Sequence, residues 1–213
     1  MGEKATVKRY LVFLAGVFIC ACGIAFLSRS ALGTSALSSV SFVLFLATGV
    51  SAGAYTFACN MVFWVADALL QRRLGWMQWL QIPATVVFSV CINFWLELSP
   101  TQFGGSLPMQ VIYMCLGCPI MAFGIALEVF ANVTILPGEG IVRTLAEKSG
   151  MEFGNVKVGF DCVLTLIAAV LAFIFFGRLN GVGIGTLVSA VAVGQFVRLY
   201  SHKLGKFRAW VLK

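Results

Sequence analysis

The chain contains few charged residues, and this indicates what class of protein it is. Only 11% of the 213 residues are charged, against roughly 25% in an ordinary soluble domain. Apolar residues make up 60%, and the mean hydropathy is +0.97. A soluble domain could not bury so much apolar surface, so the sequence indicates an integral membrane protein. It contains no polar linker or low-complexity tract, which favours one membrane domain over residues 1–213.

Histidine is also scarce, since His202 is the single copy. This excludes zinc sites built on His pairs, bis-His haem and an intramembrane Ser-His-Asp triad. The seven cysteines fall in apolar stretches, where we expect packing roles; soft-metal transport is the alternative. Residues 181–185 are glycine-rich but lack the Gly-Lys-Ser/Thr of a nucleotide loop. No nucleophile–base pair stands out, so we expect neither an enzyme nor a bound cofactor.

The apolar residues form six stretches that are long enough to cross a membrane, which takes about 20 helical residues. They lie at roughly 10–28, 53–71, 76–98, 108–130, 154–176 and 182–200. Two shorter segments, 34–48 and 138–149, lie between spans at equivalent places in the two halves. The first is too short for a span and the second is charged. The sequence therefore predicts an all-α protein with six transmembrane helices and two short extra helices.

The distribution of Lys and Arg predicts the orientation. With the N-terminus in the cytoplasm, six spans leave only Arg29 and Arg178 of the 15 cations outside. That is a strong positive-inside bias, and it places both termini in the cytoplasm. It also explains the net charge of +7 without nucleic-acid binding. The basic tail 201–213 alternates cations with apolar residues, so we expect it to lie on the anionic inner leaflet. The thirteen cations predicted to face inside are Lys4, Lys8, Arg9, Arg72, Arg73, Arg143, Lys148, Lys157, Arg198, Lys203, Lys206, Arg208 and Lys213.

The two halves of the chain resemble each other at a shift of 101 positions. Repeat 1 covers about 9–99 and repeat 2 about 108–203. Because each copy holds three spans, the second copy enters the membrane from the opposite side, which makes the duplication an inverted repeat. Such an arrangement can expose a central site to either side in turn. The matched positions are Gly16 with Gly117, Gly23 with Gly124, Gly49 with Gly150, Gly53 with Gly154, and Asn60 with Asp161.

Polar residues inside the predicted spans are the first candidates for a site, because charge is costly there. Asp161 lies two turns into the fifth span, with Lys157 one turn earlier on the same face. One interpretation is a structural ion pair, with Lys157 reaching toward the cytoplasmic boundary. The other is a substrate-ion or proton site, with Asn60 as its uncharged counterpart from the first half. Asp67, Glu128 and Glu97 lie near span ends, where a surface position explains them.

The two short segments carry the remaining candidates. In Pro137-Gly138-Glu139-Gly140, Pro and Gly allow a sharp entry, and the backbone N–H groups that follow are free to bind an acceptor. Glu139 and Arg143 share one helix face. In the first half Thr34, Ser35 and Ser38 hold the equivalent place without charge; they either bind a ligand or hydrogen-bond within their own helix.

These runs resemble the YczE/YyaS/YitT family of bacterial membrane proteins over nearly the whole chain. The similar stretches are Ala31–Val40, Pro137–Arg143, Phe153–Asp161 and Phe176–Leu179. The chain differs where members often have Pro at the position of Ala36 and Gly-Pro at the positions of Gly194-Gln195. The resemblance implies a small multi-pass protein of the bacterial cytoplasmic membrane that is proposed to be a transporter. It implies no particular substrate.

The leading hypothesis is a secondary transporter, an exporter of a small organic or amphipathic solute. Asp161 or Glu139 would be the coupling carboxylate, with Arg143 and Lys157 tuning it. A channel that oligomerises, for instance as a homodimer through glycine-rich faces such as Gly16 and Gly23, is an alternative. A non-transporting accessory protein for a biosynthetic or signalling partner is another. The expected partners are a small-molecule or ion substrate and the bilayer, and no nucleic acid.

Overall fold

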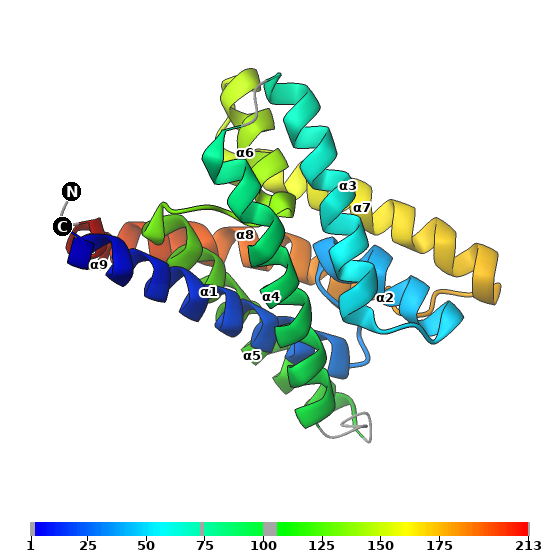
Figure 1. The fold of residues 1–213 in the computed structure, drawn as a ribbon. Coiled ribbons are helices and arrows are strands. Elements are labelled where there is room, and N and C mark those ends of the chain that lie inside the picture. The colour runs from blue at the N-terminus through cyan, green and yellow to red at the C-terminus, as the bar shows by residue number, and fades with distance from the viewer. Residues whose placement is uncertain (1–2, 73–74, 100–105, 213) are drawn as a thin grey trace.

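The computed structural model describes residues 3–72, 75–99 and 106–212, with residues 3–6 described by their backbone alone. The chain in these ranges is helical, and Figure 1 shows the arrangement. The predicted inner cations Arg73 and Lys213 lie outside the described residues. The helices are α1 Glu3–Arg29, α2 Ala36–Thr48, α3 Ala52–Gln71, α4 Trp76–Leu98, α5 Leu107–Ala131, α6 Pro137–Ser149, α7 Phe153–Phe176, α8 Ile184–Lys203 and α9 Gly205–Leu212.

Six of these helices, α1, α3, α4, α5, α7 and α8, are long and apolar enough to cross a membrane. This confirms the predicted spans, with ends that differ by a few residues. Large apolar side chains cover much of their outer surface; Leu69, Trp76 and Ile184 are each more than 70% exposed. Soluble monomers rarely expose contiguous apolar surface of this kind, whereas a bilayer would cover it. The all-α membrane fold follows from both observations.

The two short helices α2 and α6 both contain 13 residues. At 1.5 Å per residue each is about 20 Å long, too short for a hydrocarbon core of about 30 Å. Ser35 caps α2 by accepting the Ser38 amide, and α6 begins at Pro137. Each ends at a glycine with left-handed backbone, Gly49 with φ 75° and Gly150 with φ 69°. Glycine takes this conformation at little cost, so the matched glycines end both helices at corresponding points.

Among the described residues, helices α1 and α5 share the most extensive contact, and glycines allow them to approach closely. A Cβ atom at Gly16 would lie 2.8 Å from the Gly124 carbonyl oxygen, and one at Gly23 would collide with the Met121 backbone. Close approach through small residues is how membrane helices commonly pack. The glycine face that suggested contact with a second copy is therefore occupied within the chain.

The short helices pack across the two halves. Helix α2 of the first half lies against α7 of the second, and α6 of the second lies against α3 of the first. Within each half, the first and the last long helix are also in contact: α4 contacts α1, and α8 contacts α5. Figure 1 shows α6 beside one end of α3 and α2 near its other end. These four contacts thus form two matched pairs, in which an element of one half is replaced by the equivalent element of the other.

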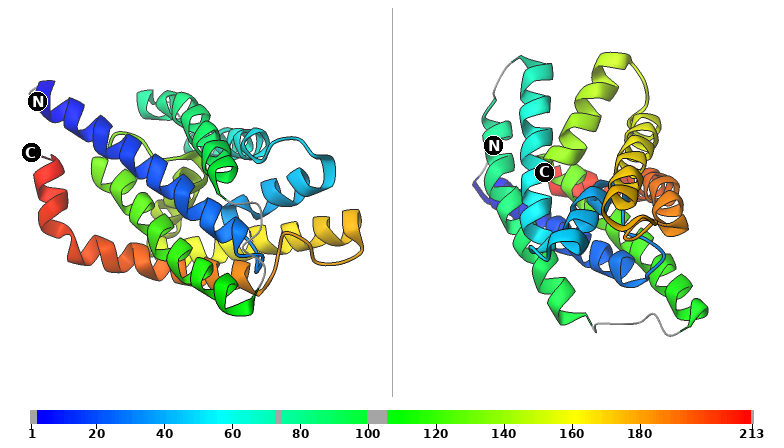
Figure 2. Two further views of the ribbon diagram at one scale, coloured as in Figure 1. Left: turned by 90° about the horizontal axis from the view of Figure 1, so that it is seen from below. Right: turned by 90° about the vertical axis from the view of Figure 1, so that its right-hand side faces the viewer.

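The C-terminal tail folds back onto the start of the chain. Residues Ser201–Lys203 continue α8, and α9 contacts both α1 and α5. The Lys8 ammonium lies 4.4 Å from the centre of the Trp210 ring and donates to the Trp210 carbonyl oxygen. Val211 is fully buried, while Phe207 and Trp210 stay exposed. The two termini therefore lie at the same end of the molecule, as Figures 1 and 2 show.

Candidate functional site

Three ionisable side chains meet inside the molecule where α6 contacts α7. The Lys157 ammonium nitrogen lies 3.0 Å from Asp161 Oδ1 and 4.0 Å from Glu139 Oε1. None of the three residues is more than 4% exposed. The i, i+4 spacing on α7 places Lys157 and Asp161 on one face, and α6 adds Glu139 from across the contact. Lys157 points inward, so the expectation that it would extend to the boundary is wrong.

The first turn of α6 fixes Glu139 in this group. The Gly138 amide donates to Asn60 Oδ1 at 3.3 Å, and Asn60 Nδ2 donates to the Thr56 carbonyl oxygen at 2.9 Å. A Cβ at Gly138 would lie 2.7 Å from a methyl group of Leu37 on α2, so glycine lets α6 come this close. Burial raises the pKa of the Glu139 carboxyl above its usual range, while the Lys157 ammonium opposes that shift.

A third buried carboxyl, that of Glu128, lies in the last turn of α5. It is 1% exposed, so the surface position expected for it is wrong. Within the described residues neither of its oxygens has a hydrogen-bond partner of normal geometry, although the Leu136 amide and Glu139 act on it electrostatically. Gly16 on α1 gives it room: a Cβ there would lie 3.0 Å from Glu128 Cγ. The Glu128 side chain is buried by the contact between α1 and α5, and this contact could not be predicted from the sequence pattern.

The charges of this group do not balance. Glu128, Glu139 and Asp161 could together carry three negative charges, and Lys157 supplies one positive charge. Excess charge inside a protein costs several kcal/mol per ion, so such groups take up protons or a cation. The Glu128–Glu139–Lys157–Asp161 group, called the acid–lysine group below, is therefore suited to binding and releasing a proton or a small cation.

A small cavity lies beside this group. It has a volume of about 20 Å³ and receives side chains from six helices, α1 to α6. That is room for about one water molecule or one monatomic ion. An organic solute does not fit in this conformation. Its polar lining comprises Cys20, Ser38, Thr56, Asn60 and Glu139.

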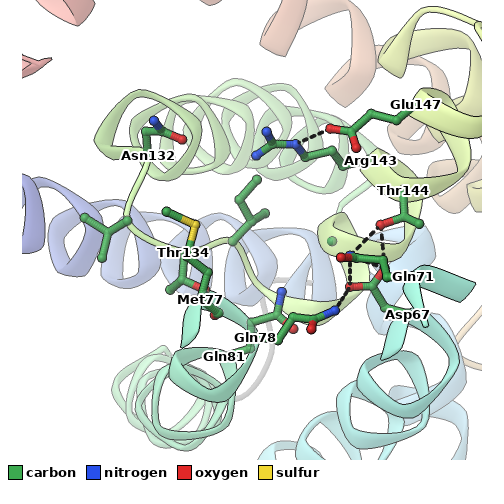
Figure 3. A pocket seen from close by; sticks show the side chains of 13 residues that line it. Asp67, Gln71, Met77, Gln78, Gln81, Asn132, Thr134, Arg143, Thr144 and Glu147 are labelled. Atoms are coloured by element: carbon green, nitrogen blue, oxygen red, sulfur yellow. Dashed lines mark hydrogen bonds and ion pairs between the residues drawn. The ribbon is translucent and has the colours of Figure 1, made fainter. Parts of the chain in front are cut away.

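A second polar group surrounds Asp67 on α3, as Figure 3 shows. Asp67 is 1% exposed, and its oxygens accept from Thr144 Oγ1 at 2.5 Å, Gln71 Nε2 at 2.9 and 3.0 Å, and Gln78 Nε2 at 3.5 Å. The surface position expected for Asp67 is therefore also wrong. These side chains face a cavity of about 220 Å³ between α3, α4, α6 and the loop after α5. This cavity is called the Asp67 cavity below.

The structure separates Arg143 from the acid–lysine group. Arg143 Nε lies 2.9 Å from Glu147 Oε1, and both side chains are more than half exposed at the wall of the Asp67 cavity (Figure 3). Gly140 faces the same cavity, where a Cβ would lie 2.9 Å from Gln81 Nε2. The i, i+4 spacing predicted that Arg143 would share a helix face with Glu139. In the structure, the Arg143 side chain instead lines the Asp67 cavity, opposite residues of α4.

The serines and threonine of the first half make local hydrogen bonds. Thr34 Oγ1 lies 2.9 Å from Ser28 Oγ, and Ser35 Oγ lies 3.1 Å from Ser38 Oγ. Ser38 also lines the small cavity, whereas Thr34 and Ser35 do not. Of the first-half candidates, Ser38 and Asn60 are thus beside the acid–lysine group.

The chain is similar over most of its length to two proteins of Bacillus subtilis. It is 24% identical over 199 residues to the uncharacterized membrane protein YczE of Bacillus subtilis, covering 92% of this chain and 86% of YczE. It is 24% identical over 196 residues to the uncharacterized protein YyaS of the same organism, covering 90% of this chain and 92% of YyaS. No solved structure matches the chain. The model of the family of unknown function DUF6198 matches residues 7–202, and the chain belongs to this family.

Proposed function

We propose that this protein is a secondary transporter that exports a small organic or amphipathic solute from the cytoplasm. The acid–lysine group would be its coupling site, where a proton or small cation binds on one side of the membrane and leaves on the other. The observation that carries the proposal is the excess of buried carboxyls over ammonium groups: Glu128, Glu139 and Asp161 against Lys157. Unbalanced intramembrane charge of this kind usually marks ion or proton pathways.

The arrangement of the two halves supports alternating access. The order of long and short helices in α1–α4 recurs in α5–α8, and the contact of α2 with α7 is matched by that of α6 with α3. The positive-inside bias orients the two copies oppositely, with both termini in the cytoplasm of a bacterium. Rocking of one half against the other would then open the central site to either side.

The acid–lysine group lies where such a movement would act. Glu139 is on α6, Lys157 and Asp161 are on α7, and the Asn60 carboxamide that holds the start of α6 belongs to α3 of the first half. Protonation of Glu139 or Glu128 reduces the net negative charge and favours the closed arrangement. Loss of that proton restores the charge and favours an arrangement that admits water. Proton movement and the change in access are then linked through the same residues.

The test is transport by the purified full chain in proteoliposomes, with and without a pH gradient. Radiolabelled amines, amino acids and organic acids are the probes. We expect gradient-dependent flux of at least one of these classes, lost in Glu139→Gln and in Asp161→Asn but kept in Glu97→Gln, whose side chain is exposed near the end of α4. Unchanged gradient-driven flux in both site variants would overturn the proposal. Single-channel currents that need no gradient of a second solute would favour a channel instead.

A further inference from the structure

We further propose that the Asp67 cavity binds a small organic ammonium ion, with the Asp67 carboxylate as its charge partner. This inference rests on the proposed function and names the class of solute that enters the transporter from the cytoplasm. With the orientation proposed above, the end of α3 and the start of α4 place this cavity on the cytoplasmic side. It is distinct from the acid–lysine group and shares no side chain with it.

The Asp67 carboxylate is buried among neutral donors. Thr144, Gln71 and Gln78 donate to it, and no Lys or Arg nitrogen of the described residues lies within 4.0 Å of its oxygens. Neutral donors reduce the cost of a buried carboxylate but leave its charge unbalanced. A cation in the adjoining cavity would supply the missing balance.

The cavity wall offers a further acceptor. Gln81 is 5% exposed and lines the cavity, and within the described residues its Oε1 atom has no hydrogen-bond partner. A buried acceptor without a partner costs roughly 1–3 kcal/mol, so such an atom favours a ligand that donates. An ammonium group donates two or three hydrogen bonds and carries the charge that Asp67 lacks. Organic anions would instead be repelled by Asp67.

The size of the cavity limits the ligand. The volume of about 220 Å³ is about eleven times that of the small cavity beside the acid–lysine group. This suits an amine of a few heavy atoms and is below the usual range of roughly 300–1,000 Å³ for drug-sized ligands. Gly140 keeps the space open, because a Cβ there would lie 2.9 Å from Gln81 Nε2 and 3.7 Å from Asp67 Oδ2. The exposed Arg143–Glu147 pair lies at the wall, where solvent weakens it, so it presents little barrier to entry.

Helix α6 joins the two sites. Glu139 meets Lys157, and the next residue, Gly140, together with Thr144, faces the Asp67 cavity. A ligand that pulls on the Asp67–Thr144 hydrogen bond therefore acts on the same 13-residue helix that holds the coupling carboxyl. This gives amine binding a direct structural route to the acid–lysine group.

Binding to the purified full chain in detergent tests the inference without any gradient. The probes are ethanolamine and putrescine, with 1,4-butanediol as the neutral analogue of putrescine and succinate as an anion. Isothermal titration should show saturable binding of an amine, weakened at least tenfold by Asp67→Asn and by Gly140→Ala, and unchanged by Glu97→Gln. Gly140→Ala keeps the test valid should Asp67→Asn fail to fold, because it changes the cavity volume and leaves Asp67 in place.

Equal binding of butanediol, binding of succinate instead of amines, or binding that neither variant weakens would overturn the inference. The proposed function is tested separately, by Glu139→Gln and Asp161→Asn in flux assays. Amine binding combined with unaltered flux in those variants would refute the coupling site and leave the amine site standing. The opposite combination, coupled flux of another solute class without amine binding, would refute the amine site alone.

Discussion

Replacing Lys157 with Met should destabilise the folded protein by about 3–5 kcal/mol, the usual cost of removing one member of a buried ion pair. The reason is geometric: the Lys157 nitrogen lies 3.0 Å from Asp161 Oδ1 and 4.0 Å from Glu139 Oε1, and the side chain is 2% exposed. Without it, Asp161 and Glu139 would face each other with no cation between them. Methionine fills nearly the same volume as the apolar part of lysine. The loss of stability therefore measures the removal of the charge and not the creation of a cavity.

The double variant Lys157→Met/Asp161→Asn separates charge from packing. It removes the closer carboxylate together with the ammonium, and replacement of both members of a buried pair by neutral residues is often close to neutral. We therefore expect the double variant to recover most of the stability that the single variant loses. Lys148→Met is the matched control, because Lys148 is on α6 but exposed.

The measurement is the free energy of unfolding of the full chain in mixed micelles, titrated with sodium dodecyl sulfate and followed by tryptophan fluorescence. Our reasoning would be refuted if Lys157→Met were as stable as Lys148→Met. It would also be refuted if the double variant were no more stable than Lys157→Met, because Asp161 would then not depend on Lys157 for its charge.

Three further predictions follow from packing and charge. Gly16→Leu should cost roughly 1–3 kcal/mol or more, because the side chain would enter the α1–α5 contact; in the same unfolding assay Gly159→Leu, with open space around its Cβ, should cost far less. Because burial raises the pKa of Glu139, the folded state binds more protons there than the unfolded state. Stability should therefore fall as pH rises from the ordinary glutamate pKa of about 4.3 toward the raised value, and Glu139→Gln should remove that part of the pH dependence. Arg143→Gln should change stability by less than about 1 kcal/mol, since its ion pair with Glu147 is exposed; a larger loss would mean that the pair holds α6 in place.

The helices could be predicted from the sequence because their signals are local. Long apolar runs define the six spans, and Gly49 and Gly150 end the short helices where the backbone turns left-handed. The pairing of Lys157 with Asp161 is local as well, since a helix brings residues four positions apart together. The shift of 101 residues matched α2 to α6 at both ends.

The composition of the sites could be predicted only in part, because it depends on contacts between distant helices. Glu139 joins Lys157 through the packing of α6 on α7, and Glu128 is buried by the approach of Gly16 on α1. Asp67 is covered when α6 crosses α3 and brings Thr144 to it. In the sequence, Asp67 and Glu128 lie near the ends of spans, where most acids reach solvent; their burial is a property of the tertiary fold.

The most direct test of the coupling claim is proton movement itself. Proteoliposomes containing the full chain and an internal pH-sensitive dye would be given an outward gradient of a solute that the protein transports. Our account predicts that the solute gradient drives protons inward, and that Glu139→Gln lets the solute equilibrate without moving protons. Proton movement at the wild-type rate in Glu139→Gln, or solute flux that moves no protons or small cations in the unaltered protein, would contradict the account.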